Sequence, residues 1–411
     1  MGGGDRAGRS EPHGLRDQNG RTLGGLEVRV EAFGPAFEPF VNELSELLPD
    51  TSLVVDAHTH LGADDDGRSQ DLTTLLECLD TVGADTRACV FPFHDPERRP
   101  RYRVPNDRVL ASAEQSEGRL TPYCRLDPAD DAVAEAERCL ARGACGIKLH
   151  PRAQAFGFDD GAVEAIFDVA RDANVPILIH AGRGMPPMDH LSELALRFPE
   201  VSLILAHAGI AGQGMFATTL ADHPSVLYDT SAFAAIDVVE LFARVPAERI
   251  IFASDSPYGQ PLPDLYLAMR AAARAGVDAH GRGMIAGGTM AAVLERRPRP
   301  KPNAPLLEQV RPASGRLLRI SGYLMMAYGA ALSVSPPDAA RAGEGIALAR
   351  CVCRDPDPGG AGAAIDRIDD ALAAVERNLS EGDAALVTSA ISLAVAAAAV
   401  AATEPAAGST S

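Results

Sequence analysis

The stretch LVVDAHTHLG (residues 53–62) contains two histidines at a spacing that suits metal binding. His58 and His60 lie two residues apart in an apolar, strand-like run, so both side chains point to the same side of the strand. By the same alternation we expect Asp56 on that side too. Imidazole nitrogens and carboxylate oxygens are ligands for zinc and similar divalent cations. This stretch therefore predicts part of a metal site.

Polar side chains also stand at the ends of later apolar runs. The residues concerned are Lys148, His150, His180, His207 and Asp255. Of the ten histidines in the chain, five end predicted strands, and buried imidazoles are costly unless each finds a polar partner. A metal ion would satisfy several of them at once. We therefore expect these side chains to converge on a shared metal site.

The elements that would position these side chains alternate regularly along the chain. Apolar or β-branched runs are separated by segments with helical periodicity. The runs are 53–58, 88–93, 120–126, 144–150, 175–180, 202–207, 225–231 and 249–255. Such alternation predicts parallel strands with crossover helices, and eight units in roughly 250 residues match a (β/α)8 or TIM barrel. No G-x-G-x-x-G follows the first run, which argues against the rival fold, an open doubly wound sheet.

A closed barrel would gather the strand ends at one rim, where barrels of this type carry their chemistry. Further rim residues that would contact a substrate are His94, Arg125, Asp127, Arg152, Arg183 and Asp229. Several arginines near one mouth suit a carboxylate or phosphate group. The alternative is that each arginine pairs with one of the many acidic residues of this chain.

Domain boundaries are predicted from shifts in composition. We expect a disordered tail at 1–25, a barrel at 26–296, a proline-rich basic linker at 297–305, an alanine-rich helical domain at 306–404 and a tail at 405–411. The predicted fold class is thus α/β, a (β/α)8 TIM barrel with a C-terminal all-helical appended domain.

Composition limits the partners and the compartment. The formal net charge of −18 argues against binding to nucleic acid or to an anionic membrane surface. Seven cysteines, an odd number without a CxxC pair, favour reduced thiols and a cytoplasmic protein. Residues 384–403 are long enough to span a bilayer. They consist mostly of alanine and lack flanking basic anchors, so we predict a packed helix there.

The local phrases DAHTHLG, GIKLHP, PILIHAG, LILAHAG, YDTS and ASDSPYG resemble the amidohydrolase superfamily. They look like its amidohydrolase-related branch, which includes decarboxylases and lactonases. The resemblance spans about residues 50–296 and leaves 306–404 without a counterpart. It implies one divalent metal ion, with zinc expected, and His207 beside it as an acid/base or second-metal ligand. The ligands that it implies are His58, His60, His180 and Asp255.

Lys148 leaves the number of metal ions open. In some branches of the superfamily, a lysine after the fourth strand is carboxylated and bridges two metal ions. In the alternative, Lys148 stays an ammonium and pairs with a substrate carboxylate or with Asp56. We favour one ion, as in most of the related branch. The residues expected to contact the substrate are Arg125, His150, Arg152 and Arg183.

The expected function is that of a metal-dependent hydrolase. A divalent metal lowers the pKa of bound water from 15.7 toward about 7. Asp255 would then accept a proton as the water attacks an amide, ester or lactone carbonyl of a small metabolite. The alternative reaction at this site is non-oxidative decarboxylation of a small aromatic or unsaturated carboxylic acid, with His207 or Asp255 supplying a proton.

A third hypothesis is a barrel that has lost catalysis and serves as a binding module. The complete set of histidines and aspartate argues against it. We expect a small-molecule substrate, with a carboxylate group suggested, and we leave homo-oligomer formation open.

Overall fold

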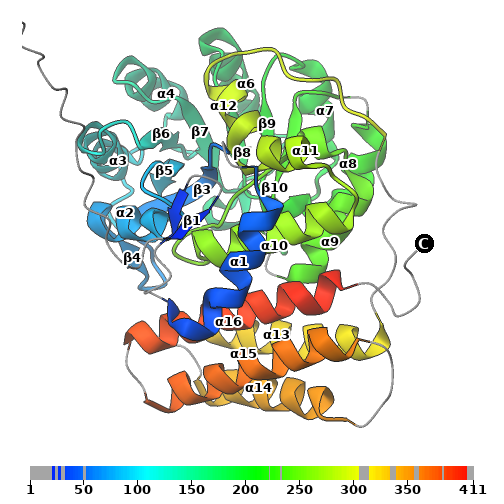
Figure 1. The fold of residues 1–411 in the computed structure, drawn as a ribbon. Coiled ribbons are helices and arrows are strands. Elements are labelled where there is room, and N and C mark those ends of the chain that lie inside the picture. The colour runs from blue at the N-terminus through cyan, green and yellow to red at the C-terminus, as the bar shows by residue number, and fades with distance from the viewer. Residues whose placement is uncertain are drawn as a thin grey trace, which may run out of the picture.

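The computed structural model describes residues 21–23, 26–28, 33–49, 52–221, 223–231, 234–304, 314–333, 339–355, 361–381 and 384–404. An α/β barrel comes first, followed by four long helices (Figure 1). Most of the predicted N-terminal tail, and all of 405–411, lie outside the described residues. Within the predicted tail, Arg21–Leu23 forms strand β1, which pairs antiparallel with β2 (Leu26–Val28). The expectation of a tail is therefore wrong for these three residues.

The barrel strands coincide with the eight predicted apolar runs. They are β3 (Val55–Ala63), β5 (Arg87–Pro92), β6 (Leu120–Arg125), β7 (Gly146–Leu149), β8 (Ile177–Ile179), β9 (Leu203–Leu205), β10 (Val226–Asp229) and β11 (Ile250–Ile251). Neighbours in this series pair in parallel, and β4 (Ser69–Gln70) adds to the end of β3 as an antiparallel strand. The predicted α/β fold with parallel strands is confirmed.

The sheet closes between its first strand and the segment after its last. The backbone nitrogen of Asp255 donates to His58 O at 2.9 Å, and that of His60 donates to Ser256 O at 2.9 Å. Thr59 and Ser256 form a parallel bridge at the same place. This seam, defined here as His58–His60 against Asp255–Ser256, completes the predicted barrel.

Alternate residues of the strands fill the barrel interior. The interior cluster contains Val55, Ala57, Cys89, Phe91, Tyr123, Leu178, Ile204, Leu227, Ile251 and Ala253, and it is closed by Met290 and Val293. Their neighbours along each strand pack outward against the surrounding helices. Because a slip of one residue would exchange the two sets, burial on both faces fixes the register of the strands.

Helices surround the barrel as the periodic segments predict. They are α1 (Glu38–Leu47), α2 (Leu72–Asp80), α3 (Arg103–Gln115), α4 (Ala132–Ala141), α5 (Pro151–Gln154), α6 (Gly161–Ala173), α7 (Asp189–Arg197), α8 (Gln213–Thr219), α9 (Ala235–Arg244), α10 (Pro261–Arg274), α11 (Ala279–Gly283) and α12 (Thr289–Leu294). Side-chain caps start several of them: for example, Asp71 accepts from the backbone nitrogen of Thr74, and Asp160 from that of Ala162. Helix α6 ends at Asn174 in the left-handed conformation that favours asparagine.

Four further helices, named here the C-terminal helices, stack against one side of the barrel (Figure 1). They are α13 (Gly315–Ser333), α14 (Ala339–Cys353), α15 (Gly362–Glu381) and α16 (Ala384–Thr403). Helices α16 and α13 contact the barrel helices α10 and α9. Among the described residues, no helix has the length and apolarity that crossing a membrane requires.

A buried ion network joins the C-terminal helices to the barrel. Arg270 of α10 is paired with Glu43 of α1, and its Nε donates to Thr403 Oγ1 of α16 at 2.8 Å. Arg367 of α15 reaches the same Glu43 at 2.7 Å. The Arg270 side chain is only 10% exposed, so its charge is compensated by these partners rather than by water. The network fixes where the C-terminal helices sit.

The π-helical turn η5 (Met284–Gly288) tests the packing at the base of the barrel. A Cβ added to Gly287 would lie 2.3 Å from the backbone oxygen of Leu53 and 2.8 Å from the nitrogen of Val55. Gly287→Ala should therefore lower the free energy of unfolding by about 1–3 kcal/mol, as overpacking does. Chemical denaturation measures it.

Gly322→Ala is the matched control, because a Cβ at this exposed position of α13 meets nothing within 4 Å. It should raise stability by up to about 1 kcal/mol, through the better helix propensity of alanine. Equal stability of the two variants would contradict the described packing at η5.

Candidate metal centre

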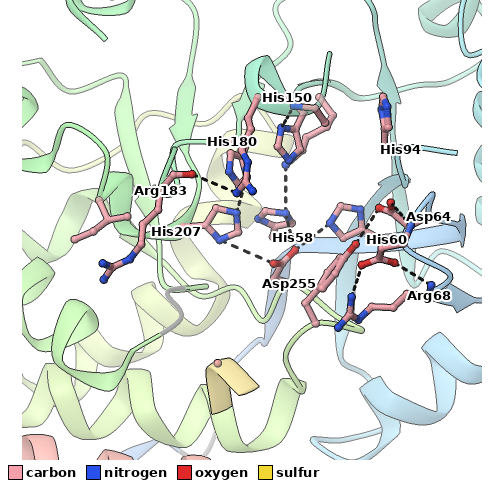
Figure 2. Close-up of a pocket in the computed structure, with 18 of the residues that line it drawn as sticks. His58, His60, Asp64, Arg68, His94, His150, His180, Arg183, His207 and Asp255 are labelled. Carbon is pink, nitrogen blue, oxygen red and sulfur yellow. Dashed lines mark hydrogen bonds and ion pairs between the residues drawn. The ribbon is translucent and has the colours of Figure 1, made fainter. Parts of the chain in front are cut away.

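A cavity of about 680 Å³ opens at the C-terminal ends of the barrel strands. Most of the residues predicted for the site line it, and the histidines and Asp255 among them are labelled in Figure 2. Asp56, Asp127 and Asp229 do not line it. The predicted residues that line it include His58, His60, Arg125, Lys148, His150, Arg152, His180, Arg183, His207 and Asp255. Residues far apart in the sequence are thus brought to one place by the barrel.

Strand β3 contains a bulge that simple alternation does not predict. Its register with β5 shifts between Asp56 and Thr59. As a result, Ala57 packs in the barrel interior while the next residue, His58, also reaches the cavity. Asp56 does not line the cavity. It accepts hydrogen bonds from the backbone nitrogens of His58 and Ser254 at 3.1 and 3.0 Å. The expectation that Asp56 shares the side of His58 is wrong because of the bulge.

Asp255 lies at the centre of the histidines. Its Oδ1 atom is 3.0 Å from Nε2 of His58 and 3.0 Å from Nε2 of His60, and its Oδ2 is 3.9 Å from Nδ1 of His207. One ligand atom each from His58, His207 and Asp255 lie within 4.8 Å of one another. Burial would raise the pKa of Asp255, but the charge and hydrogen bonds of His58, together with the bond to His60, hold it well below its usual range. Asp255 is therefore an anion.

His180 is one imidazole further from the carboxylate. Its Nδ1 lies 2.9 Å from Nε2 of His207, and its ring stacks on that of His150 with centroids 3.9 Å apart. The group of three close ligand atoms includes His207 and not His180. The resemblance in the sequence instead implied His180 as a ligand and His207 as the residue beside the metal ion. Nε2 of His180 and Nδ1 of His60 are both buried without a partner among the described residues.

Asp229 holds His58 from the other side. Its Oδ2 is 2.9 Å from Nδ1 of His58, and its Oδ1 accepts from the backbone nitrogens of His207 at 2.8 Å and Ser231 at 3.1 Å. Asp229 is fully buried at the end of β10. The sequence placed Asp229 at the rim but not in this role. The signal that could have indicated this role is an inward carboxylate at a strand end in a barrel rich in histidine, since such carboxylates often orient metal-binding imidazoles.

Two residues of the centre have strained backbones. His207 and Asp255 adopt φ angles of 56° and 61°, in the left-handed region that favours glycine. Such a conformation costs on the order of 1 kcal/mol or more for a residue with a side chain. It aims both side chains into the cavity directly after their strands, which is a feature typical of functional sites.

Lys148 projects inward from β7 and is almost fully buried. Its Nζ lies 3.3 Å from Nε2 of His58 and 4.5 Å from the centre of the Phe91 ring. Burial lowers the pKa of Lys148 to about 7. No hydrogen bond or ion pair joins Lys148 to Asp56 among the described residues, so that alternative partner is not the one the structure shows.

The donor set fits a divalent cation. Burial lowers the pKa of His60 to about 3, and it also lowers the pKa of His180 and His207. These imidazoles are therefore neutral and carry free lone pairs beside an anionic carboxylate. Burial lowers the pKa of His58 too, but Asp255 and Asp229 outweigh it and the net direction is upward. A cation would replace the proton that His58 shares with these two carboxylates.

The arginines differ in their environment. Arg125 is 1% exposed and lines the cavity, and its Nε and Nη2 atoms have no partner among the described residues. Its Nη1 donates only to a backbone oxygen, that of Pro92, at 3.3 Å. Arg183 is exposed and pairs with Asp237 at 3.2 Å. Arg152 is exposed at the rim. Arg125 is thus a buried cation that forms no ion pair among the described residues, although its guanidinium carbon lies 5.4 Å from the centre of the Tyr102 ring.

The remaining rim residues have protein partners. His94 lines the cavity with Nδ1 2.7 Å from the hydroxyl of Tyr102. Asp127 pairs with Arg99 at 3.4 Å and does not line the cavity. Tyr258, which the sequence did not single out, lines it and packs edge-on against His60 with ring centroids 5.7 Å apart.

Comparison with known proteins places these residues in a family. Residues 55–294, more than half of the chain, match the family model described as "Amidohydrolase". No curated protein matches the chain.

Solved structures resemble the barrel at low sequence identity. A probable 2-pyrone-4,6-dicarboxylic acid hydrolase from Acinetobacter baumannii has 16% identity and a TM-score of 0.45, over 59% of this chain and 99% of that one. A 5-carboxyvanillate decarboxylase from Sphingomonas paucimobilis has 14% identity and a TM-score of 0.42, over 60% and 99%. Similarity at this level carries no information about the reaction.

Substitution of Asp229 tests how His58 is oriented. In Asp229→Asn the amide oxygen can keep the bonds from His207 and Ser231, so the amide nitrogen faces Nδ1 of His58. That ring nitrogen must then accept, which leaves the proton on Nε2, beside Asp255. Zinc affinity, measured by chelator competition, should fall roughly 10- to 100-fold.

Asp237→Asn is the matched control. Asp237 lines the same cavity but pairs with exposed Arg183. Its zinc affinity should stay at the wild-type value. Equal affinities for both variants would show that Asp229 does not set the tautomer of His58.

Proposed function

The chain belongs to the amidohydrolase family, and we propose that it is a metal-dependent hydrolase of a small carboxylate-bearing molecule. The proposed ligands of one divalent cation, zinc by preference, are His58, His60, His180 and Asp255, with His207 beside them. The observation that carries the proposal is the position of Asp255, whose Oδ1 is 3.0 Å from Nε2 of both His58 and His60. A buried carboxylate that faces imidazole nitrogens is a ready cation site.

When bound, a divalent cation polarises a substrate carbonyl and lowers the pKa of water toward about 7. Asp255 is the proposed base, because it is ionised and its Oδ2 faces His207 across 3.9 Å. It would take a proton from the attacking water and return it to the leaving amine or alcohol. His207 is the proposed second acid/base: it is neutral, since burial lowers its pKa, and its Nδ1 lies 2.9 Å from the backbone oxygen of Ser231, so its Nε2 is the nitrogen that can accept a proton.

Arg125 is the proposed anchor of the substrate. Taking a guanidinium out of water is costly, and two nitrogens of Arg125 have no partner in the described part of the chain, so a carboxylate entering the cavity would satisfy them. His150, Arg152 and Arg183 are proposed as further contacts nearer the rim. Their own pairing weakens them as anion sites, since Arg183 already faces Asp237.

The metal count is proposed as one. Lys148 would bridge a second ion only as a carbamate, which requires the neutral amine. Its pKa of about 7 allows that form. However, the side chain lies 3.3 Å from Nε2 of His58, the atom assigned to the first ion. We therefore assign Lys148 to the first ion's surroundings rather than to a second site.

We further propose that the enzyme works in the cytoplasm. The seven cysteines are all free, and the most exposed of them, Cys145 and Cys351, would be open to oxidation elsewhere.

Metal content tests the site directly. The wild-type protein, purified with zinc, should hold about one ion per chain by elemental analysis. His58→Ala and Asp255→Ala should each lose it, because each removes a central ligand atom. His190→Ala, at an exposed position of α7, should keep it. Unchanged zinc in either of the first two variants would remove that residue from the site.

Binding of succinate tests the anchor. Arg125→Met should raise the dissociation constant for succinate roughly 10- to 100-fold, because a hydrogen bond to a charged group is lost. Arg183→Met, which removes an exposed arginine already paired with Asp237, should change it by less than about 3-fold. Calorimetry on the zinc-loaded proteins measures both, and equal losses would contradict the assignment of Arg125.

The products distinguish hydrolysis from decarboxylation. Zinc-loaded protein should hydrolyse members of a panel of carboxylate-bearing esters, lactones and amides. Release of carbon dioxide from aromatic or unsaturated acids, without hydrolysis of the panel, would replace the hydrolase proposal with the decarboxylase alternative.

A further inference from the structure

One wall of the cavity comes from outside the barrel. Met325 and Gly329 of α13 line it together with the histidines. They are four residues apart, so they lie on the same face of the helix. The family match ends at residue 294, before this helix begins. The C-terminal helices therefore contribute directly to the site.

We propose that this α13 wall, defined as Met325 and Gly329, sets the size of the apolar group that a carboxylate-bearing substrate carries. The inference rests on the proposed function, since it concerns the substrate of the same site.

The wall adds apolar surface to a cavity that also holds many charged residues and histidines. Met325 is 45% exposed and lines the cavity, so its side chain is accessible to a molecule that enters the site. Ile210 and Ala234 add apolar surface to the lining, whereas Arg125 and the imidazoles supply the polar side. A molecule that fits both sides has an anionic group at one end and an apolar group at the other.

Gly329 leaves room in the cavity. A Cβ added there would meet no atom within 4 Å, although the residue lines the site. A larger side chain at this position would extend into space that a substrate would otherwise fill. Position 329 is therefore one through which the helix limits the volume of the cavity.

Hydrogen bonds join the wall to the loop that follows Asp255 (residues 256–260). The hydroxyl of Tyr328, next to Gly329, donates to the backbone oxygen of Tyr258 at 2.9 Å. Tyr258 follows Asp255 by three residues, and its own hydroxyl donates to Asp64 at 2.9 Å. Ser392 of α16 donates to the side chain of Gln260 in the same loop.

These bonds, together with the network around Arg270, make the wall a fixed surface rather than a free helix. A fixed wall discriminates by size, because a bulky group cannot push it aside without breaking those contacts.

The test compares two carboxylates of different size on zinc-loaded protein. Succinate and biphenyl-4-carboxylate share the anionic group and differ in apolar bulk. Gly329→Phe should weaken binding of biphenyl-4-carboxylate at least 10-fold and that of succinate by less than 3-fold. Met325→Ala should enlarge the cavity and so strengthen binding of biphenyl-4-carboxylate relative to that of succinate.

Gly322→Phe is the matched control. It lies seven residues earlier on α13, it is exposed, and a Cβ there also meets nothing within 4 Å, but it does not line the cavity. It should leave both affinities unchanged. Thermal unfolding of all three variants confirms that they fold.

Gly329→Phe with the same affinity ratio as Gly322→Phe would overturn the inference while leaving the hydrolase proposal intact. If zinc-loaded wild-type protein bound neither carboxylate, the proposal of a carboxylate-bearing substrate would be wrong, and the inference about the wall with it. Because binding is measured without turnover, absence of hydrolysis alone leaves this test valid.

Discussion

The seam that closes the barrel is the constraint on which the centre depends. Backbone bonds between His58 and Asp255, and between His60 and Ser256, join the first strand to the segment after the last one. The same residues carry the side chains that meet around Oδ1 of Asp255. Closure of the fold and assembly of the site are thus one event. A chain that failed to close here would also leave the carboxylate without its imidazoles.

Charge balance around the seam explains why so many ionisable groups tolerate burial. Asp255 and Asp229 are anions on either side of His58, while Lys148 lies next to the same ring. Unpaired, each would be strongly destabilising in a low-dielectric interior. Together they nearly compensate one another, and the strained backbones of His207 and Asp255 keep the groups aimed at the cavity. We interpret the arrangement as one suited to a divalent cation.

Much of this architecture could be predicted from the sequence. The eight strands follow from short apolar runs at regular intervals, and the inward residues at their ends follow from the position of each run's last residue. The bulge in β3 could not be predicted, because register depends on a partner strand, and it moved Asp56 away from the cavity. The sequence could not show that two nitrogens of Arg125 have no hydrogen-bond partner among the described residues, because this depends on the whole surroundings of the side chain. The contact between Tyr328 and Tyr258 joins residues seventy apart, which no local pattern reports.

The measurement that tests the account most directly is an anomalous diffraction map of zinc-loaded crystals collected at the zinc absorption edge. The account predicts one strong peak at the seam, within about 2.0–2.2 Å of ligand atoms of His58 and Asp255. A peak elsewhere in the molecule, or density showing Asp255 turned away from both histidines of β3 in the presence of zinc, would contradict it.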